Sequence, residues 1–134
     1  MSPPAGIPFV DLSSNQPPSK TDWAAIAASG HGHAFLRATE GVVPDSAFVA
    51  HRKAARAAGV LVGAYIFWRP RHSAYENVQA LLDAAGTLAG TDWDLPLVID
   101  LEAEDKPDQL EKEDLEHHVS LGLTEIRGRC TGGG

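Results

Sequence analysis

The chain has 134 residues, of which 43% are hydrophobic, and this is enough for one domain with a buried core. Its 11 basic residues stand against 18 acidic ones, and the net charge of −7 argues against binding to nucleic acid. No apolar run is long enough to span a bilayer, and the amino terminus lacks the features of a secretory signal. Cys130 is the single cysteine, which excludes an internal disulfide.

Strand-like and helix-like patterns alternate along the chain. Apolar strand segments are expected at residues 7–10, 34–36, 60–67 and 97–101. A first helix presents Trp23 and Ile26 on one face and stops at Gly30. A second helix begins at Phe48 and ends before Gly59, a residue favoured just after a helix.

Two further helices are expected in the second half. The third begins with a capping box, in which the Ser73 hydroxyl and the Glu76 side chain each bond to the other residue's backbone amide. Its buried stripe runs from Val78 through Leu81 to Ala85. The last helix carries its apolar residues on one side: Leu115, Val119, Gly122, Leu123 and Ile126.

This order predicts an α/β fold, with about four βα units and a parallel sheet in one domain. The domain is expected to cover residues 1–134, with a Gly-rich tail at 130–134. Parallel strands are covered on both faces in most proteins, and their ligands bind at the carboxyl ends of the strands. The functional residues are therefore expected at that edge of the sheet.

Polar and aromatic side chains follow each expected strand. In chain order they are Asp11; Arg37, Thr39 and Glu40; Tyr65, Phe67 and Trp68; and Asp100 with Glu102. Asp100 and Glu102 are two apart on an apolar strand, so they project from the same face. Since a lone buried carboxylate costs several kcal/mol or changes its pKa, this pair points to chemistry.

Structural explanations remain open for the same residues. The acid pair could serve solubility at a strand end, and Asp11 could cap the turn that follows it. Glu40 could form an ion pair with Arg37 or with Arg69. The six histidines are spread over loops and helix surfaces, and no His lies near the acid pair in sequence, so no metal is expected.

Five segments in this order resemble glycoside hydrolase family 25, the Chalaropsis-type lysozymes that include phage endolysin muramidases. They are FVDLSSNQ at 9–16, TDW at 21–23, FLRATEG at 35–41, AAGVLVGAY at 57–65 and LPLVIDLE at 95–102. The resemblance runs from Gly6 to about Arg129. It implies a TIM-like (β/α) barrel that cuts the β-1,4 bond between N-acetylmuramic acid and N-acetylglucosamine in peptidoglycan, without a metal or cofactor.

The resemblance also implies roles for individual residues. Glu102 is the expected proton donor, Asp100 its neighbouring carboxylate and Asp11 the acid on the pocket floor. The expected substrate-binding residues are Arg37, Glu40, Tyr65 and Phe67. With a substrate-assisted route, the 2-acetamido group of the sugar attacks the anomeric carbon while Asp100 orients it.

The chain departs from the family pattern in two ways. Ile66 stands where the family often has a His. The later strands of the family's barrel are absent, so the expected fold is a partial barrel, truncated after the fourth βα unit. A truncated gene, a fragment and a barrel completed by a second chain are the open alternatives.

The expected function is therefore a lysozyme-type muramidase that acts on peptidoglycan glycan strands, outside the cell or in the cell wall, with no membrane or nucleic-acid partner. The competing hypothesis is a catalytically silent remnant or a cell-wall-binding module. A third is an unrelated β/α hydrolase that uses a divalent ion.

Overall fold

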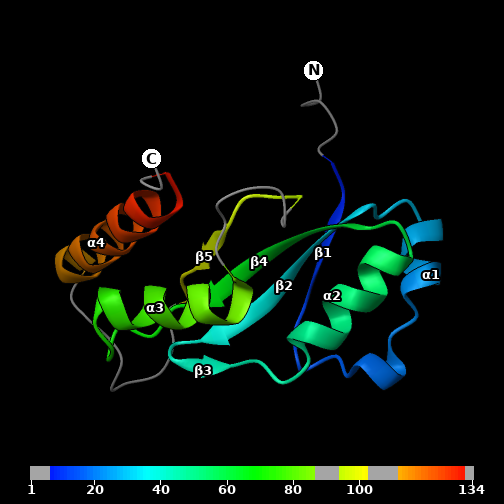
Figure 1. The fold of residues 1–134 in the computed structure, drawn as a ribbon, viewed down its shortest axis with the longest axis horizontal. Helices are drawn as coiled ribbons and strands as arrows, with labels where there is room; N and C mark the ends of the chain where they lie inside the picture. Colours follow the sequence, from blue (N-terminus) through cyan, green and yellow to red (C-terminus); the bar gives the residue numbers. More distant parts are fainter. Residues whose placement is uncertain (1–6, 87–93, 103–111, 132–134) are drawn as a thin grey trace.

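The structure, a computed structural model, describes residues 7–86, 94–102 and 112–131 of the chain (Figure 1). Its elements in chain order are β1 (Phe9–Leu12), the 3-10 helix η1 (Pro18–Lys20), α1 (Trp23–Ala28), β2 (His33–Glu40), β3 (Val43–Pro44), α2 (Phe48–Ala57), β4 (Leu61–Phe67), α3 (Ala74–Ala85), β5 (Val98–Asp100) and α4 (Lys112–Thr131). None of the helices within these ranges is long and apolar enough to cross a membrane.

The sheet has the order β1-β2-β4-β5, and all pairs along this path are parallel. The short β3 turns back and pairs antiparallel with the end of β2. Helices lie between the successive parallel strands, as Figure 1 shows. The predicted α/β class with a parallel sheet is confirmed.

The predicted bounds of several strands were wrong. The fourth strand, expected at residues 97–101, is β5 with the bounds Val98–Asp100, so Glu102 follows the strand and does not lie on it. β1 starts at Phe9 instead of residue 7, because Pro8 has no N–H to donate to the ladder. It continues to Leu12, so Asp11 lies inside the strand and not after it. β2 likewise runs on to Glu40. Polar residues inside these strands, Asp11 in β1 and Arg37 and Thr39 in β2, interrupt the apolar runs from which the strand ends were predicted.

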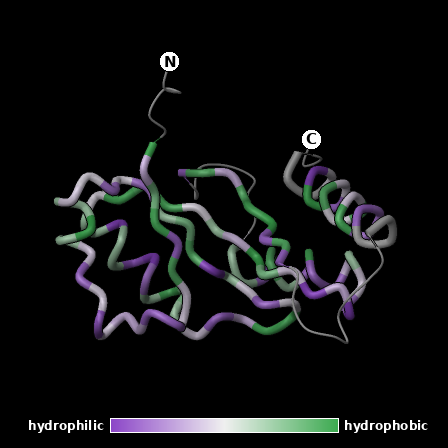
Figure 2. The backbone as a smooth tube through the Cα atoms, turned by 180° about the vertical axis from the view of Figure 1, so that it is seen from behind, coloured by the Kyte–Doolittle hydropathy of each residue, from purple (hydrophilic) through white to green (hydrophobic). Residues whose placement is uncertain are grey.

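The core lies on one face of the sheet, beneath the helices. Ala34 and Leu36 of β2 and Val62, Ala64 and Ile66 of β4 are all fully buried. Phe48 and Ala55 of α2 and Val78 and Leu81 of α3 belong to the same cluster. Figure 2 shows green hydrophobic stretches of these strands interrupted by purple hydrophilic positions. Since each large buried side chain contributes about 1.5–3 kcal/mol, this face holds most of the fold's stability.

Helix ends follow local chemistry that the sequence shows. The predicted capping box is present: Ser73 Oγ accepts from the Glu76 amide at 3.0 Å, and Glu76 Oε1 accepts from the Ser73 amide at 3.2 Å. Asp22 caps α1 by accepting from the Ala25 amide at 3.0 Å. Gly59, after α2, has a φ of 79°, which non-glycine residues rarely adopt.

The last helix, α4, packs against α3 and against Trp68. The Trp68 indole N–H donates to His118 Nδ1 at 2.9 Å, and Gly122 lies directly against the Trp68 ring. His118 is therefore half-buried and partnered, contrary to the predicted solvated surface. Its role depends on a residue 50 positions away, which the local pattern does not show.

The predicted apolar side of α4 is confirmed only in part. Val119 and Ile126 pack against the core and Gly122 is buried, whereas Leu123 is 48% exposed. The side chain of Leu115 lies outside the described residues.

Candidate functional site

A pocket of about 580 Å³ lies on the sheet face opposite the buried core. Its lining comes from all four parallel strands and the loop after β1: Phe9, Asp11, Ser13, Asn15, Gln16, Phe35, Arg37, Glu40, Tyr65, Phe67, Val98, Ile99, Asp100 and Glu102. Strand register explains this gathering. Asp11 is paired with Phe35, Arg37 with Tyr65, and Phe67 with Asp100, and paired residues in a sheet face the same side.

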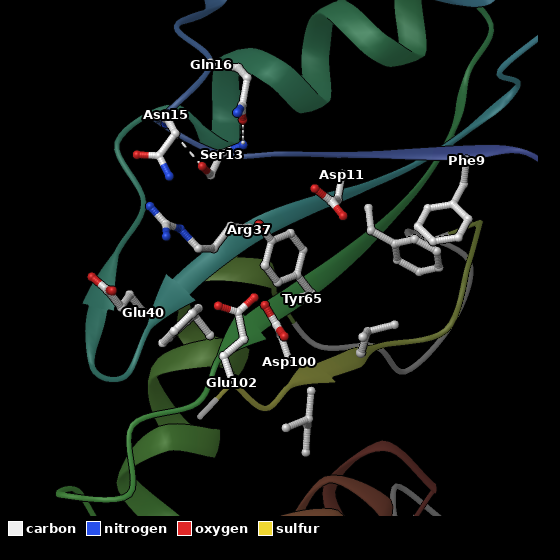
Figure 3. Close-up of a pocket in the computed structure, with 14 residues that line it drawn as sticks. Phe9, Asp11, Ser13, Asn15, Gln16, Arg37, Glu40, Tyr65, Asp100 and Glu102 are labelled. Carbon is white, nitrogen blue, oxygen red and sulfur yellow. Dashed lines mark hydrogen bonds between the residues drawn. The ribbon is translucent and has the colours of Figure 1, made fainter. Parts of the chain in front are cut away.

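All seven predicted site residues line this one pocket: Asp11, Arg37, Glu40, Tyr65, Phe67, Asp100 and Glu102. In Figure 3 the carboxylates of Asp100 and Glu102 lie side by side near the Tyr65 ring, and Asp11 reaches toward them from β1. Thr39 and Trp68, which the sequence placed at the same edge, are buried away from the pocket.

A β-bulge decides which side of β2 faces the pocket near its end. Arg37 pairs with Tyr65, but Thr39 then pairs with Ile66 and Glu40 with Phe67. The shift turns Glu40 to the pocket face and Thr39 to the core side, where Thr39 is fully buried. Bulges often re-aim a side chain at functional sites in this way. Simple alternation would have assigned these two residues the other way round.

Glu102 is an acid of the pocket whose pKa is raised above its usual value. Its pKa is raised first by the negative charge of Asp100, then by loss of hydration, by a hydrogen bond with Asp100 and by the charge of Asp11. Because the Glu102 side chain is exposed, like charges and not burial are the main cause. The arrangement favours a Glu102 that keeps its proton at a higher pH than a free glutamate.

Tyr65 is a half-buried phenol between the acids and Arg37. Burial raises its pKa to about 12, with Asp11, Asp100 and Asp45 adding to the rise and Arg37 opposing it. The hydroxyl therefore stays protonated at any physiological pH and can donate a hydrogen bond into the pocket.

Arg37, which lines the pocket, and Arg69 each have an acidic partner. Arg37 Nε donates to Asp45 Oδ2 at 2.8 Å, and Arg69 Nη2 donates to Glu40 Oε1 at 2.8 Å. The guanidinium of Arg69 also lies 4.7 Å from the centre of the Phe67 ring. Of the two partners that the sequence left open for Glu40, the structure has Arg69.

The loop after β1 forms one wall of the pocket. Ser13 Oγ accepts from the Asn15 amide at 3.1 Å, and Gln16 Oε1 accepts from the Ser13 amide at 3.0 Å. These two bonds close the turn, which is the capping role that the sequence left open for Asp11. Asp11 instead points into the pocket, as Figure 3 shows.

A buried histidine holds this loop in place. His51 of α2 is 1% exposed, and its Nδ1 accepts from the Trp23 indole N–H at 3.2 Å. The other ring nitrogen, Nε2, is therefore the donor to the Gln16 carbonyl at 2.6 Å. The predicted position of this histidine on a surface was wrong, and its role was not predicted. The signal was its place on the buried side of α2, with Phe48 and Ala55.

In this pocket Glu102 can donate a proton while the carboxylates of Asp11 and Asp100 lie close by. Cleavage of an acetal needs this combination of a proton donor and a nearby negative charge. Within residues 7–86, 94–102 and 112–131, no group of three or more His, Cys, Asp or Glu side chains is arranged to hold a metal ion. The chemistry open to the described residues is general acid catalysis with electrostatic stabilisation of a cationic transition state.

Comparison with known proteins gives one family. The model of "Glycosyl hydrolases family 25" matches residues 10–131. A muramidase from Trichobolus zukalii matches with a TM-score of 0.82 and 24% identity, covering 94% of this chain and 62% of its own. A muramidase from Acremonium alcalophilum matches with a TM-score of 0.81 and 26% identity, covering 92% of this chain and 61% of its own. A bacterial lysozyme from Streptomyces coelicolor matches with a TM-score of 0.81 and 24% identity, covering 96% of this chain and 61% of its own.

The chain thus spans about three fifths of the length of these solved structures. No curated protein gives a significant match. At this level of identity the likeness to the solved structures speaks for the fold, and the family model adds the sequence motifs to it.

Proposed function

Because the chain belongs to glycosyl hydrolase family 25, we propose that it is a lysozyme-type muramidase. Its substrate is the peptidoglycan glycan strand, cut at the β-1,4 bond between N-acetylmuramic acid and N-acetylglucosamine. The observation that supports this most is the meeting of Asp11, Asp100 and Glu102 in one pocket at the sheet face opposite the core. The place of action is the cell wall.

In this proposal Glu102 is the general acid. It gives its proton to the glycosidic oxygen as the bond to the anomeric carbon breaks, and the leaving sugar departs as an alcohol. The raised pKa of Glu102 supports the role, because an acid must still hold its proton at the working pH.

The substrate supplies the nucleophile. The carbonyl oxygen of its 2-acetamido group attacks the anomeric carbon and forms a cyclic oxazolinium, whose positive charge Asp100 stabilises and Asp11 supports from β1. Water then opens this ring at the anomeric carbon and gives its proton to Glu102, which restores the acid. A glycosyl ester found on Asp11 or Asp100 by mass spectrometry would contradict this route.

The direct test is clearing of a purified peptidoglycan suspension by the native chain and by Glu102→Gln. We expect the variant to lose about 10²–10⁴-fold in rate, the usual worth of a general acid. Glu116→Gln is the matched control, because it makes the same substitution at an exposed position on α4, outside the pocket. Its clearing rate should equal that of the native chain.

Two results would overturn the proposal: no clearing by the native chain, or equal clearing by the Glu102 variant. Sedimentation with cell walls separates the competing hypothesis from simple inactivity. A chain that binds cell walls and releases no reducing ends would be a cell-wall-binding module.

A further inference from the structure

Asp45 is a buried carboxylate that no step of the proposed reaction uses. It lies between β3 and α2, and its side chain is completely inaccessible to solvent. Oδ2 accepts from Arg37 Nε at 2.8 Å and from the Ser14 amide at 3.1 Å, while Oδ1 accepts from the Ala47 amide at 2.8 Å. One carboxylate thus joins β2, the loop after β1 and the start of α2.

The same network fixes the direction of the Arg37 guanidinium. Nε is held by Asp45, and Nη2 donates to Ser14 Oγ at 3.2 Å. Since the Ser14 amide also donates to Asp45, both bonds hold the guanidinium beside the loop after β1. Arg37 nevertheless lines the same pocket as the three acids, and its charge and those of Asp11 and Asp100 all act on Tyr65. The Arg37 guanidinium therefore belongs to the same pocket as the acids, but its hydrogen bonds hold it against Asp45 and Ser14.

We propose that Asp45 is a positioning residue: by binding Arg37 to the loop after β1, it keeps this cation from pairing with the acids of the pocket. The inference rests on the proposed role of Glu102. Arginine and carboxylate form strong, often bidentate pairs, so a released Arg37 would have ready partners in Asp11 and Asp100.

Pairing of Arg37 with Asp100 would make Glu102 a poorer proton donor. Among the described residues, the charged or titratable groups that line the pocket with Glu102 are Asp11 of β1, Arg37 and Glu40 of β2, Tyr65 of β4 and Asp100 of β5. Glu40 is already paired with Arg69. The negative charge of Asp100 is the largest cause of the raised pKa of Glu102, and an arginine paired with Asp100 would cancel it. Glu102 would then lose its proton at a lower pH.

The test follows the Glu102 carboxyl carbon by NMR across a pH titration of the ¹³C-glutamate-labelled chain. Glu102→Gln identifies the resonance by its disappearance. We expect Asp45→Asn to move the Glu102 titration to lower pH. The measurement needs no substrate, so it stands even if the chain fails to clear peptidoglycan, and the two failures can be told apart.

A double mutant separates positioning from the direct loss of the Asp45 charge. In the Arg37→Gln background no cation is left to release, so adding Asp45→Asn should change the Glu102 titration much less than it does in the native background. Equal shifts in both backgrounds would overturn the proposal, as would an unchanged titration in the single Asp45 variant. A purely structural Asp45 predicts lower stability with the titration of Glu102 unmoved.

Ser14→Ala keeps the proposal testable if Asp45→Asn does not fold. It removes one of the two anchors of Arg37, from an exposed position, and leaves the carboxylate of Asp45 in place. We expect a smaller shift of the Glu102 titration in the same direction. A folded Ser14 variant with the native titration would then overturn the proposal.

Discussion

The two faces of the sheet are made from the same strands and have opposite properties. In β2, Ala34 and Leu36 are fully buried under the helices, while their neighbours Phe35 and Arg37 face the pocket. The period of two along a strand separates the residues that stabilise the fold from those that carry charge. The pocket face can hold the three acids Asp11, Asp100 and Glu102 because the other face supplies the hydrophobic burial.

The largest expected difference between the faces is in stability. Leu36→Ala should cost about 2–5 kcal/mol, because it leaves a cavity in a fully buried position. Leu61→Ala is the matched control: the same change at a position 44% exposed should cost under about 1 kcal/mol. Denaturant unfolding measures both. Equal costs would show that the helix-covered face is not the main source of stability.

A second prediction concerns how closely α4 packs against Trp68. A methyl group at Gly122 would collide with the Trp68 ring, so Gly122→Ala should cost about 1–3 kcal/mol. In the same helix, a methyl group at Gly128 meets no atom within 4 Å. Gly128→Ala should therefore stabilise the chain by about 0.5–1 kcal/mol. Thermal unfolding of the two variants tests the docking of α4, and a neutral Gly122→Ala would contradict it.

The third prediction tests how much the N-cap of α3, one of the helices that cover the core, contributes to stability. Ser73→Ala removes the cap of α3 and should cost about 1 kcal/mol. Thr124→Ala is the control, because its hydroxyl donates to the Ser120 carbonyl within α4 and caps nothing. We expect the control to be nearly neutral in denaturant unfolding. A neutral Ser73→Ala would mean that tertiary packing alone starts α3 at this point.

The smallest effect on the fold is expected on the pocket face, where the change is in protonation. Asp100→Asn removes the main cause of the raised pKa of Glu102, so Glu102 should titrate at lower pH, and the basic limb of clearing activity should move the same way. Asp11→Asn should give a smaller shift in the same direction, since Asp11 is the weakest of the causes. A larger effect from Asp11 would contradict the assigned order.

The raised pKa of Glu102 also determines how its ionisation affects the stability of the fold. A carboxyl whose pKa is raised in the folded state is repelled there once it ionises, so it disfavours folding above that pKa. Asp100→Asn should thus leave stability at neutral pH unchanged or slightly higher. This is the opposite of what Leu36→Ala does on the other face.

Local patterns predicted much of the fold, because helix caps and the spacing of apolar residues act over a few residues. The box of Ser73 and Glu76 and the stop at Gly59 are examples. The two Trp–His pairs were missed for the opposite reason. Trp23 meets His51, and Trp68 meets His118, across separations of 28 and 50 residues.

By itself the sequence determined the alternation of strands and helices, the two acids spaced two residues apart at a strand end, and the family motifs that surround them. These depend on the period of the backbone and on residue types, which are local properties. Only the tertiary structure decided that a bulge turns Glu40 and not Thr39 to the pocket, that Arg69 is the partner of Glu40, and that Asp45 ties down Arg37. Register between strands and pairing between distant charges depend on how the whole chain packs, which no local pattern contains.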